Sequence, residues 1–252
     1  MKLIIILFGH IRTFRDTIKN TLCILEQHPE LEIEWYIHTW TQIEHSDYCW
    51  WNETLSKNVI IPIINYTESP AYKEWNFIRE NYPNLNIKRF IIEDYKLEKD
   101  NNRIELSFPK GLTDSSYYHA YKKLTPYLNE YPENTPVLRI RPDSSFDATE
   151  FTAMAKAIVK NPDQIFSHTV GHGTYGYCCD ILYITSLKIL RKLATPGIVK
   201  WLDNSNHSMP ETRFGALLNS MNVPVIFFDS YLYLLRMNGS IYYYNHNNPK
   251  RT

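Results

Sequence analysis

The sequence predicts one α/β domain with helices on both faces of a central sheet that is mostly parallel at first and mixed later. Residues 3–8 (LIIILF) are continuously apolar, as in a parallel strand buried on both faces. Residues 3–40 then read strand, helix, strand, which a parallel sheet requires because only a crossover returns the chain to the same edge. Strands and helices continue to alternate without an internal repeat. This arrangement is Rossmann-like.

The composition fits a globular chain and excludes some partners. Hydrophobic residues make up 44% of the 252 residues, against 21% that are charged, so the chain can bury a substantial core. Lys+Arg and Asp+Glu both number 27, so no overall field attracts nucleic acid or an acidic membrane surface. Any anion site must therefore be local.

The start of the chain and its cysteines indicate a cytoplasmic location. The apolar run at 3–8 is followed by Gly-His-Ile-Arg instead of a small-residue cleavage site, so it is interpreted as a strand and not as a secretory signal. No segment approaches the roughly 20 apolar residues that span a bilayer. The four cysteines show neither zinc spacing nor a dense disulfide framework. We expect a reducing compartment and no integral membrane segment.

The first half of the chain is expected to contain three further strands, one of them irregular, and two helices after the first strand. Apolar residues at helical spacing and β-branched runs predict a helix from Thr13 to about Gln27, a strand at 33–40, a helix at 74–82 and a strand at 87–95. Residues 59–64 (VIIPII) predict an irregular or edge strand, because Pro62 lacks a backbone donor. The polar stretch from Lys96 to Asp114 is expected to be a surface loop.

The second half is expected to continue the alternation. The predicted elements are a helix within Ser115 to Tyr131 that breaks near Pro126, strand 137–141, helix Thr149 to Val159, strand 180–186, helix 186–194, helix Glu211 to Met221 and strand 223–228. A glycine-rich segment, GHGTYGY, lies at 171–177.

Two strand ends carry candidate ligand-binding residues, because open α/β sheets bind ligands outside the carboxyl ends of their strands. After the first strand, Gly9 allows close backbone approach, and Arg12 beside free helix amides could hold a phosphate. The alternative is an ordinary strand-to-helix turn. On the next strand, His38 and Trp40 lie on one side, where they could bind a ribose and stack on a base. A core histidine packed beside a tryptophan is an equally good interpretation.

The stretch VLRIRPD at 137–143 combines a buried strand with charged residues. Period two places Arg139 and Arg141 on one side of the strand, where they are costly unless they meet carboxylates or phosphates. Asp143, just beyond the strand, could then bind magnesium or manganese that bridges a diphosphate. The alternative is a structural arginine–aspartate network.

Acidic and aromatic residues of the second half could serve an acceptor. Tyr175 and Tyr177 could pack on the apolar faces of a sugar or form a tight aromatic turn. Asp180 precedes a strand, and Glu211 follows Pro210 at a helix start. Helix capping is the default role of Glu211, and catalytic base is its competitor.

In their order along the chain, the motifs resemble GT-A type glycosyltransferases, in particular the divergent bacterial and viral polysaccharide-biosynthesis proteins of the WavE-like group. The matching pieces cover most of the chain: FGHIRTF, YIHTW, YYHAYKKL, LRIRPDSSF, CCDILYITSLKIL and PETRFGALLNSMNVPV. The resemblance implies an enzyme that moves a sugar from a nucleotide-sugar donor to a saccharide acceptor in surface polysaccharide or glycan biosynthesis. It further implies a single GT-A-like domain over 1–252, with a nucleotide-binding half at 1–147 and an acceptor-binding half at 148–252.

The resemblance also assigns roles. An Asp-x-Asp motif that holds a divalent cation is replaced here by Arg141-Pro142-Asp143, so Asp143 would need a second metal ligand from Asp147 or His246. An acidic residue near the acceptor, Asp180 or Glu211, would act as general base if the transfer inverts the anomeric centre. The expected donor-binding residues are Gly9, His10, Arg12, His38, Arg139 and Arg141.

Two other functions stay open. A sugar nucleotidyltransferase would normally carry a glycine-rich loop with lysine and arginine after the first strand, and GHIRTF has only one glycine. A non-catalytic nucleotide- or carbohydrate-binding domain would bind without turnover.

Overall fold

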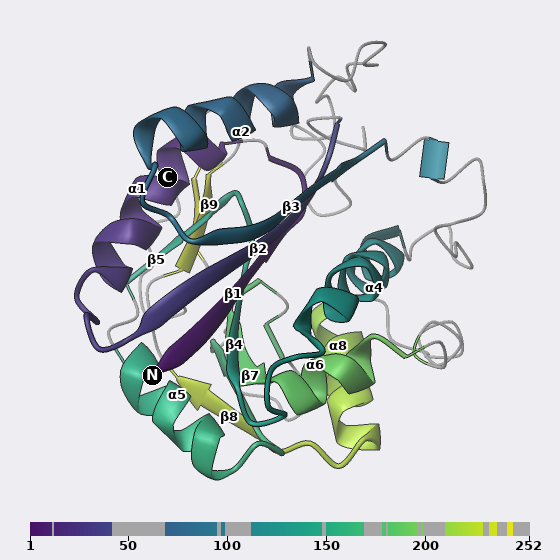
Figure 1. The fold of residues 1–252 in the computed structure, drawn as a ribbon. Helices are drawn as coiled ribbons and strands as arrows, with labels where there is room; N and C mark the ends of the chain where they lie inside the picture. Colours follow the sequence, from purple (N-terminus) through teal and green to yellow (C-terminus); the bar gives the residue numbers. More distant parts are fainter. Residues whose placement is uncertain are drawn as a thin grey trace.

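The computed structural model describes residues 1–11, 13–41, 69–94, 97–98, 112–147, 150–168, 178–179, 181–195, 198, 210–228, 232–235 and 241–243, and all structural statements concern these residues. A twisted central sheet separates two layers of helices (Figure 1).

The central sheet has seven strands in the order β3-β2-β1-β4-β7-β6-β8. Their bounds are β1 Lys2–Phe8, β2 Glu32–Trp40, β3 Ile87–Glu93, β4 Pro136–Ile140, β6 Ile165–His168, β7 Tyr183–Ser186 and β8 Val225–Phe228. The first four strands pair in parallel, whereas β7 runs antiparallel to both β4 and β6. The predicted sheet, parallel at first and mixed later, is confirmed.

Alternation along β1 explains why its sequence is continuously apolar. Leu3, Ile5 and Leu7 pack into the core on one face of the sheet, and Ile4, Ile6 and Phe8 pack into the core on the other. All six are at most 2% exposed. Burial on both faces selects apolar residues at every position and removes the period-two signal of a half-exposed strand.

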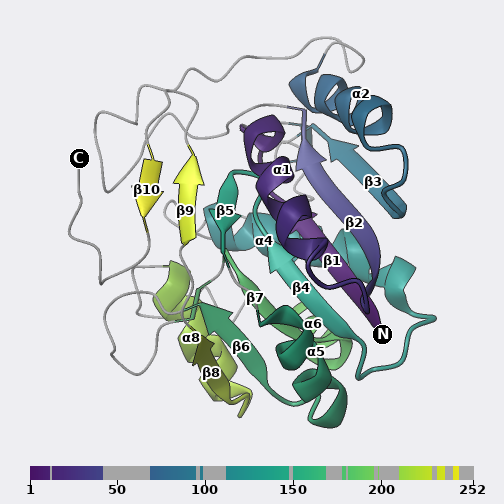
Figure 2. The ribbon, with the colours of Figure 1, turned by 90° about the vertical axis from the view of Figure 1, so that its left-hand side faces the viewer.

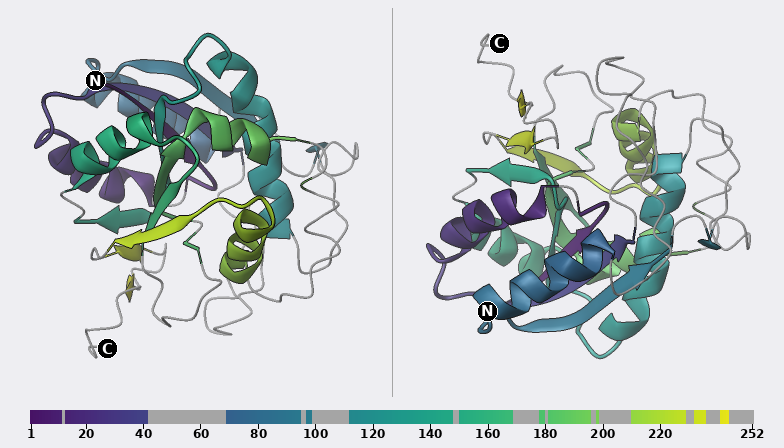
Figure 3. Two further views of the ribbon diagram at one scale, coloured as in Figure 1. Left: turned by 90° about the horizontal axis from the view of Figure 1, so that it is seen from below. Right: turned by 90° about the horizontal axis from the view of Figure 1, so that it is seen from above.

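The helices divide between the two faces. One layer consists of α1 (Phe14–Leu25), α2 (Pro70–Asn81) and α5 (Phe151–Lys160), and the other of α4 (Leu112–Leu124), α6 (Leu187–Leu193) and α8 (Pro210–Ser220). Figure 3 shows the same separation from below and from above. Within the described part of the chain, none of these helices combines the length and apolar character needed to cross a membrane.

The helix expected within Ser115 to Tyr131 begins earlier than predicted and breaks where predicted, near Pro126. α4 begins at Leu112, so the last three residues of the expected loop are helical, and it ends at Leu124. A 3-10 helix, η3 (Thr125–Leu128), continues from it. Pro126 explains this change, because proline lacks the N–H that another α-helical turn needs. The strand expected at 59–64 lies outside the described residues.

A small second sheet was not expected. β5 (Ser144–Phe146), β9 (Leu232–Leu235) and β10 (Ile241–Tyr243) pair antiparallel in the order β10-β9-β5 (Figure 2). A turn leads from β4 into β5, in which the Ser144 hydroxyl donates to the Arg141 carbonyl over 2.7 Å. With only three residues, β5 is too short to show a period in the sequence.

Candidate functional site

The carboxyl ends of β1, β2 and β4 meet at one edge of the sheet. Phe8 pairs with His38 in the parallel register of β1 and β2, and Leu7 pairs with Ile140 of β4. The residues that follow each strand therefore lie next to one another. This edge is where open α/β sheets bind ligands.

Gly9 occupies this edge in a conformation that requires glycine. Its φ is +131°, and a Cβ atom would lie 3.3 Å from Cδ of Pro142. Its N–H donates to the His38 carbonyl over 3.3 Å, and its carbonyl accepts from the Thr39 hydroxyl over 2.8 Å. Pro142 is the group that lies close to Gly9, and the approach of a donor phosphate to its backbone stays a prediction.

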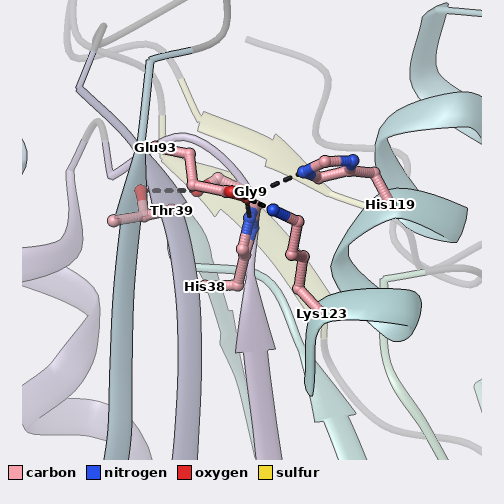
Figure 4. Close-up of polar contacts among 6 residues, drawn as sticks. All are labelled: Gly9, His38, Thr39, Glu93, His119 and Lys123. Carbon is pink, nitrogen blue, oxygen red and sulfur yellow. Dashed lines mark hydrogen bonds and ion pairs between the residues drawn. The ribbon is translucent and has the colours of Figure 1, made fainter. Parts of the chain in front are cut away.

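Beside Gly9, four side chains form what we call the His-Glu cluster: His38, Glu93, His119 and Lys123 (Figure 4). Oε2 of Glu93 lies 2.7 Å from Nε2 of both His38 and His119. Oε1 accepts from the ammonium of Lys123 over 2.5 Å. Because an ionised carboxylate only accepts hydrogen bonds, both Nε2 atoms carry the proton in this arrangement.

Three elements supply the His-Glu cluster. His38 and Glu93 come from the ends of the parallel neighbours β2 and β3, and His119 and Lys123 are one turn apart on α4. The two histidines are at most 2% exposed. The packing of α4 against the sheet thus brings helical donors to a carboxylate at a strand end.

The surroundings perturb the acid–base properties of the cluster. Burial alone would raise the pKa of Glu93, but hydrogen bonds from His119, His38 and Lys123 outweigh it and hold that pKa well below its usual range. Burial lowers the pKa of His38, and the hydrogen bond with Glu93 offsets only part of this effect. Glu93 is therefore charged, and His38 is neutral, near neutral pH.

Trp40 packs within a set of histidine rings. Its ring centroid lies 4.8 Å from that of His38, edge to face, and 5.4 Å from that of His119, stacked. This contact confirms that His38 and Trp40 share one side of β2. Trp40 is 1% exposed and His38 is fully buried, so the geometry favours the core interpretation of both over direct contact with a base or ribose. His10, 6% exposed, lies against Trp40 at 6.4 Å.

Arg141 and Asp143 form a bidentate ion pair across the turn after β4. Nε of Arg141 donates to Oδ1 over 2.9 Å, and Nη2 donates to Oδ2 over 2.8 Å. The Asp143 side chain is 1% exposed and that of Arg141 is 18% exposed. This is the arginine–aspartate network that the sequence left open as an alternative.

The Arg141–Asp143 pair does not suit a hard cation as it stands. Magnesium and manganese prefer several oxygen ligands, and both oxygens of Asp143 already face a guanidinium. Asp147 is exposed beyond β5, and His246 lies outside the described residues. The metal-binding roles of these three residues stay predictions.

Arg139 lies inside the core. It is fully buried, its guanidinium carbon lies 3.7 Å from the centre of the Phe8 ring, and Nη1 donates to the Ile181 carbonyl over 3.3 Å. Its neighbours Leu138 and Ile140 face the opposite core, as period two predicts. This position favours a structural role for Arg139, because an aromatic ring covers its charge, and its donor-binding role stays a prediction.

Several other predicted site residues lie outside the part of the chain that the structure describes. Arg12 and Asp180 lie outside the described residues, as do Tyr175 and Tyr177. Glu211 is the second residue of α8, which confirms its place at a helix start. Its predicted catalytic role is untested.

The site residues predicted from the sequence do not include Glu93, His119 or Lys123. The strand-end rule that selected His38 also applies to Glu93, the last residue of the next strand. His119 and Lys123 are spaced i, i+4 within YYHAYKKL, which places them on one helix face. These two signals were available, but the sequence does not show that the helix packs over that strand end.

Comparison with known proteins shows the fold. No protein-family model matches the sequence, and no curated protein matches it. The chain is similar to the structure of an active-site mutant of LgtC, with a TM-score of 0.50 and 13% identity over 89% of this chain and 72% of that one. It is also similar to LgtC, a galactosyltransferase, in complex with donor and acceptor sugar analogues (TM-score 0.48, 13% identity, 89% and 72% covered). HddC from Yersinia pseudotuberculosis matches with a TM-score of 0.45 and 10% identity over 93% of each chain.

The likeness with a TM-score of 0.50 shows the fold alone, because its identity is only 13%. The mixed seven-stranded sheet and the LgtC likeness confirm that the chain has a GT-A-like fold, as the motif resemblance implies.

Proposed function

We propose that the protein is a nucleotide-sugar-dependent glycosyltransferase that transfers a sugar to a saccharide acceptor in surface polysaccharide or glycan biosynthesis. The observation that carries this proposal is the edge at which β1, β2 and β4 end in register within a GT-A-like sheet. Gly9 brings bare backbone to this edge, and Arg141 brings a partly exposed cation.

The donor would lie across this edge. The nucleotide would occupy the ends of β1 and β2, next to Gly9 and His10, within the half at 1–147. The diphosphate would face Arg141 and Arg12, whose guanidinium groups suit phosphate oxygens. His38 would support the site from beneath through its ring contact with Trp40.

The transfer itself is a substitution at the anomeric carbon. An acceptor hydroxyl oxygen forms the new bond to that carbon, the bond to the diphosphate oxygen breaks, and the nucleoside diphosphate leaves with the electron pair. In an inverting transfer, Glu211 or Asp180, in the half at 148–252, would take the hydroxyl proton. Positive charge near Arg141 would stabilise the departing diphosphate. A cytoplasmic location is part of the proposal, because nucleotide-sugars would be supplied there.

A panel of nucleotide-sugars tests the proposal, with thermal shift to report binding and chromatography to report slow donor hydrolysis, each with and without manganese. Stabilisation by one nucleoside diphosphate class together with released sugar supports the transferase. Exchange between a nucleoside triphosphate and a sugar 1-phosphate would instead show a nucleotidyltransferase. Binding without turnover would show a binding domain, and no response to any nucleotide would overturn both enzyme functions.

The variant Glu211→Gln tests the proposed base. If Glu211 takes the acceptor proton, transfer should fall by at least tenfold while the thermal shift with the donor stays the same. Equal transfer rates for the variant and the wild type would show that Glu211 is not the base and is only part of the first turn of α8.

A further inference from the structure

The ligand atoms of His38, Glu93 and His119 converge on one point between two strand ends and α4. Each residue offers one atom, and the three atoms lie within 4.8 Å of one another. We propose that these three side chains bind a transition-metal ion of the zinc class, and that Lys123 holds the carboxylate from outside the coordination sphere.

The distances allow such an ion. The two histidine Nε2 atoms lie 2.7 Å from Oε2 of Glu93, at hydrogen-bond separation. Around a tetrahedral zinc ion with bonds of about 2.0–2.1 Å, neighbouring ligand atoms are about 3.3 Å apart. An outward movement of about 0.6 Å at each of these two pairs therefore gives the spacing that ligand atoms have around such an ion.

The donor set selects the kind of metal. Two imidazoles and one carboxylate, with a fourth position for water, are a common ligand set for zinc. Magnesium and calcium prefer oxygen ligands throughout, so two nitrogen ligands disfavour them. The proposed site therefore differs in chemistry from the manganese or magnesium ion expected beside a diphosphate.

Coordination through Nε2 requires that the proton of a neutral imidazole lies on Nδ1. Nδ1 of His38 is buried and has no partner among the described residues, so no described group opposes the tautomer that frees Nε2 to coordinate.

Lys123 occupies the remaining carboxylate oxygen. Its ammonium lies 2.5 Å from Oε1 of Glu93, and its side chain is 36% exposed. It can thus orient the carboxylate while part of its charge stays in water, which limits its repulsion of an ion on Oε2.

The site is separate from the Arg141–Asp143 pair. β1 lies between β2, which carries His38, and β4, which leads to Asp143. Two strand spacings correspond to roughly 10 Å. A bound ion would join the ends of β2 and β3 to α4 beside Gly9, and its binding needs no nucleotide.

The test titrates the full chain, freed of metal by a chelator, with cobalt chloride and zinc chloride in the absence of nucleotide. The proposal expects one equivalent of cobalt with the visible absorption bands of a four- or five-coordinate nitrogen–oxygen site, displacement of cobalt by zinc, and a rise in melting temperature. Magnesium chloride should neither displace cobalt nor raise the melting temperature. Absent cobalt bands in the wild-type chain would overturn the proposal and leave the cluster as a closed hydrogen-bonded network.

Variants locate the ion. Glu93→Gln and His119→Gln should weaken cobalt binding by at least tenfold, whereas His28→Gln should leave it unchanged. His28 is a matched control because it is a buried histidine that contacts the Thr152 hydroxyl at 2.9 Å, outside the cluster. Equal cobalt binding by all three variants would overturn the assignment.

If a cluster variant does not fold, the wild-type cobalt spectrum still decides whether a nitrogen–oxygen site exists. Because no nucleotide is present, the outcome is independent of the proposed transferase activity.

Discussion

Arg141 donates two hydrogen bonds to Asp143, from Nε to Oδ1 over 2.9 Å and from Nη2 to Oδ2 over 2.8 Å. The pair closes the turn that leads from β4 to β5. The carboxylate is 1% exposed, so its charge depends on the Arg141 guanidinium far more than on water. The resemblance places a metal-binding motif at this position, and here an arginine supplies the positive charge.

Asp143→Ala should therefore destabilise the protein. Removal of the carboxylate leaves Arg141 without its bidentate partner, and we expect a loss of about 2–3 kcal/mol, below the range for a fully buried pair because Arg141 keeps some contact with solvent. Urea denaturation measures this loss. Asp163→Ala breaks an exposed pair with Lys188 and should cost less than about 1 kcal/mol. A stable but inactive Asp143→Ala protein would point instead to a metal or substrate ligand.

The main sheet could be predicted from the sequence because its signals are local. Burial on both faces made residues 3–8 uniformly apolar, and period two in β4 correctly placed Arg139 on the face opposite Leu138 and Ile140. The different surroundings of Arg139 and Arg141 could not be predicted, because depth in the sheet depends on which helix covers the strand.

The His-Glu cluster could not be predicted for a similar reason. Glu93 and His119 are 26 residues apart, and their contact depends on how α4 packs over the end of β3. No local pattern encodes that packing. The Arg141–Asp143 pair, in contrast, spans two residues, and the sequence already allowed it as an alternative.

Gly9→Ala should destabilise the edge where the strands end. The alanine Cβ would meet Pro142, and the φ of +131° is unfavourable for any L side chain, so we expect a loss of about 1–3 kcal/mol. Urea denaturation of Gly9→Ala, Pro142→Ala and the double variant separates the two causes. Relative to Gly9→Ala, the double variant should recover only the part of the lost stability that comes from the contact with Pro142. Full recovery would show that the backbone conformation costs little.

Arg139→Lys should also be destabilising, although the charge is kept. A lysine cannot reproduce the planar stacking of the guanidinium on Phe8 together with the hydrogen bond to Ile181, so we expect a loss of about 2 kcal/mol. Arg89→Lys is the matched control, because Arg89 stacks on Tyr127 at the exposed surface and its replacement should cost less than about 0.5 kcal/mol. A stable Arg139→Lys protein with weakened nucleotide binding would contradict this structural role and support the predicted donor-binding role of Arg139.

Glu34 should make the stability of the protein depend on pH. It is 2% exposed and accepts hydrogen bonds from Lys2 over 2.8 Å and from the Tyr131 hydroxyl over 2.6 Å. Burial alone would raise the pKa of Glu34, but these partners outweigh burial and lower it from the ordinary value of 4.5. The folded state therefore holds the Glu34 proton less tightly than the unfolded state. This contribution to stability is complete above pH 4.5 and is lost as the pH falls below it.

Glu34→Gln should consequently lower the free energy of unfolding at pH 7 by about 2 kcal/mol, and the difference from the wild type should narrow as the pH falls below about 4.5. Urea denaturation over pH 3–7, with the chelator present, measures both curves. Glu32→Gln is the control, because the Glu32 side chain is 64% exposed and lies 3.6 Å from the same Lys2 ammonium. Its curve should run close to that of the wild type. Parallel curves for Glu34→Gln and the wild type would mean that the Glu34 pKa is the same in both states, and that its hydrogen bonds do not favour the charged form.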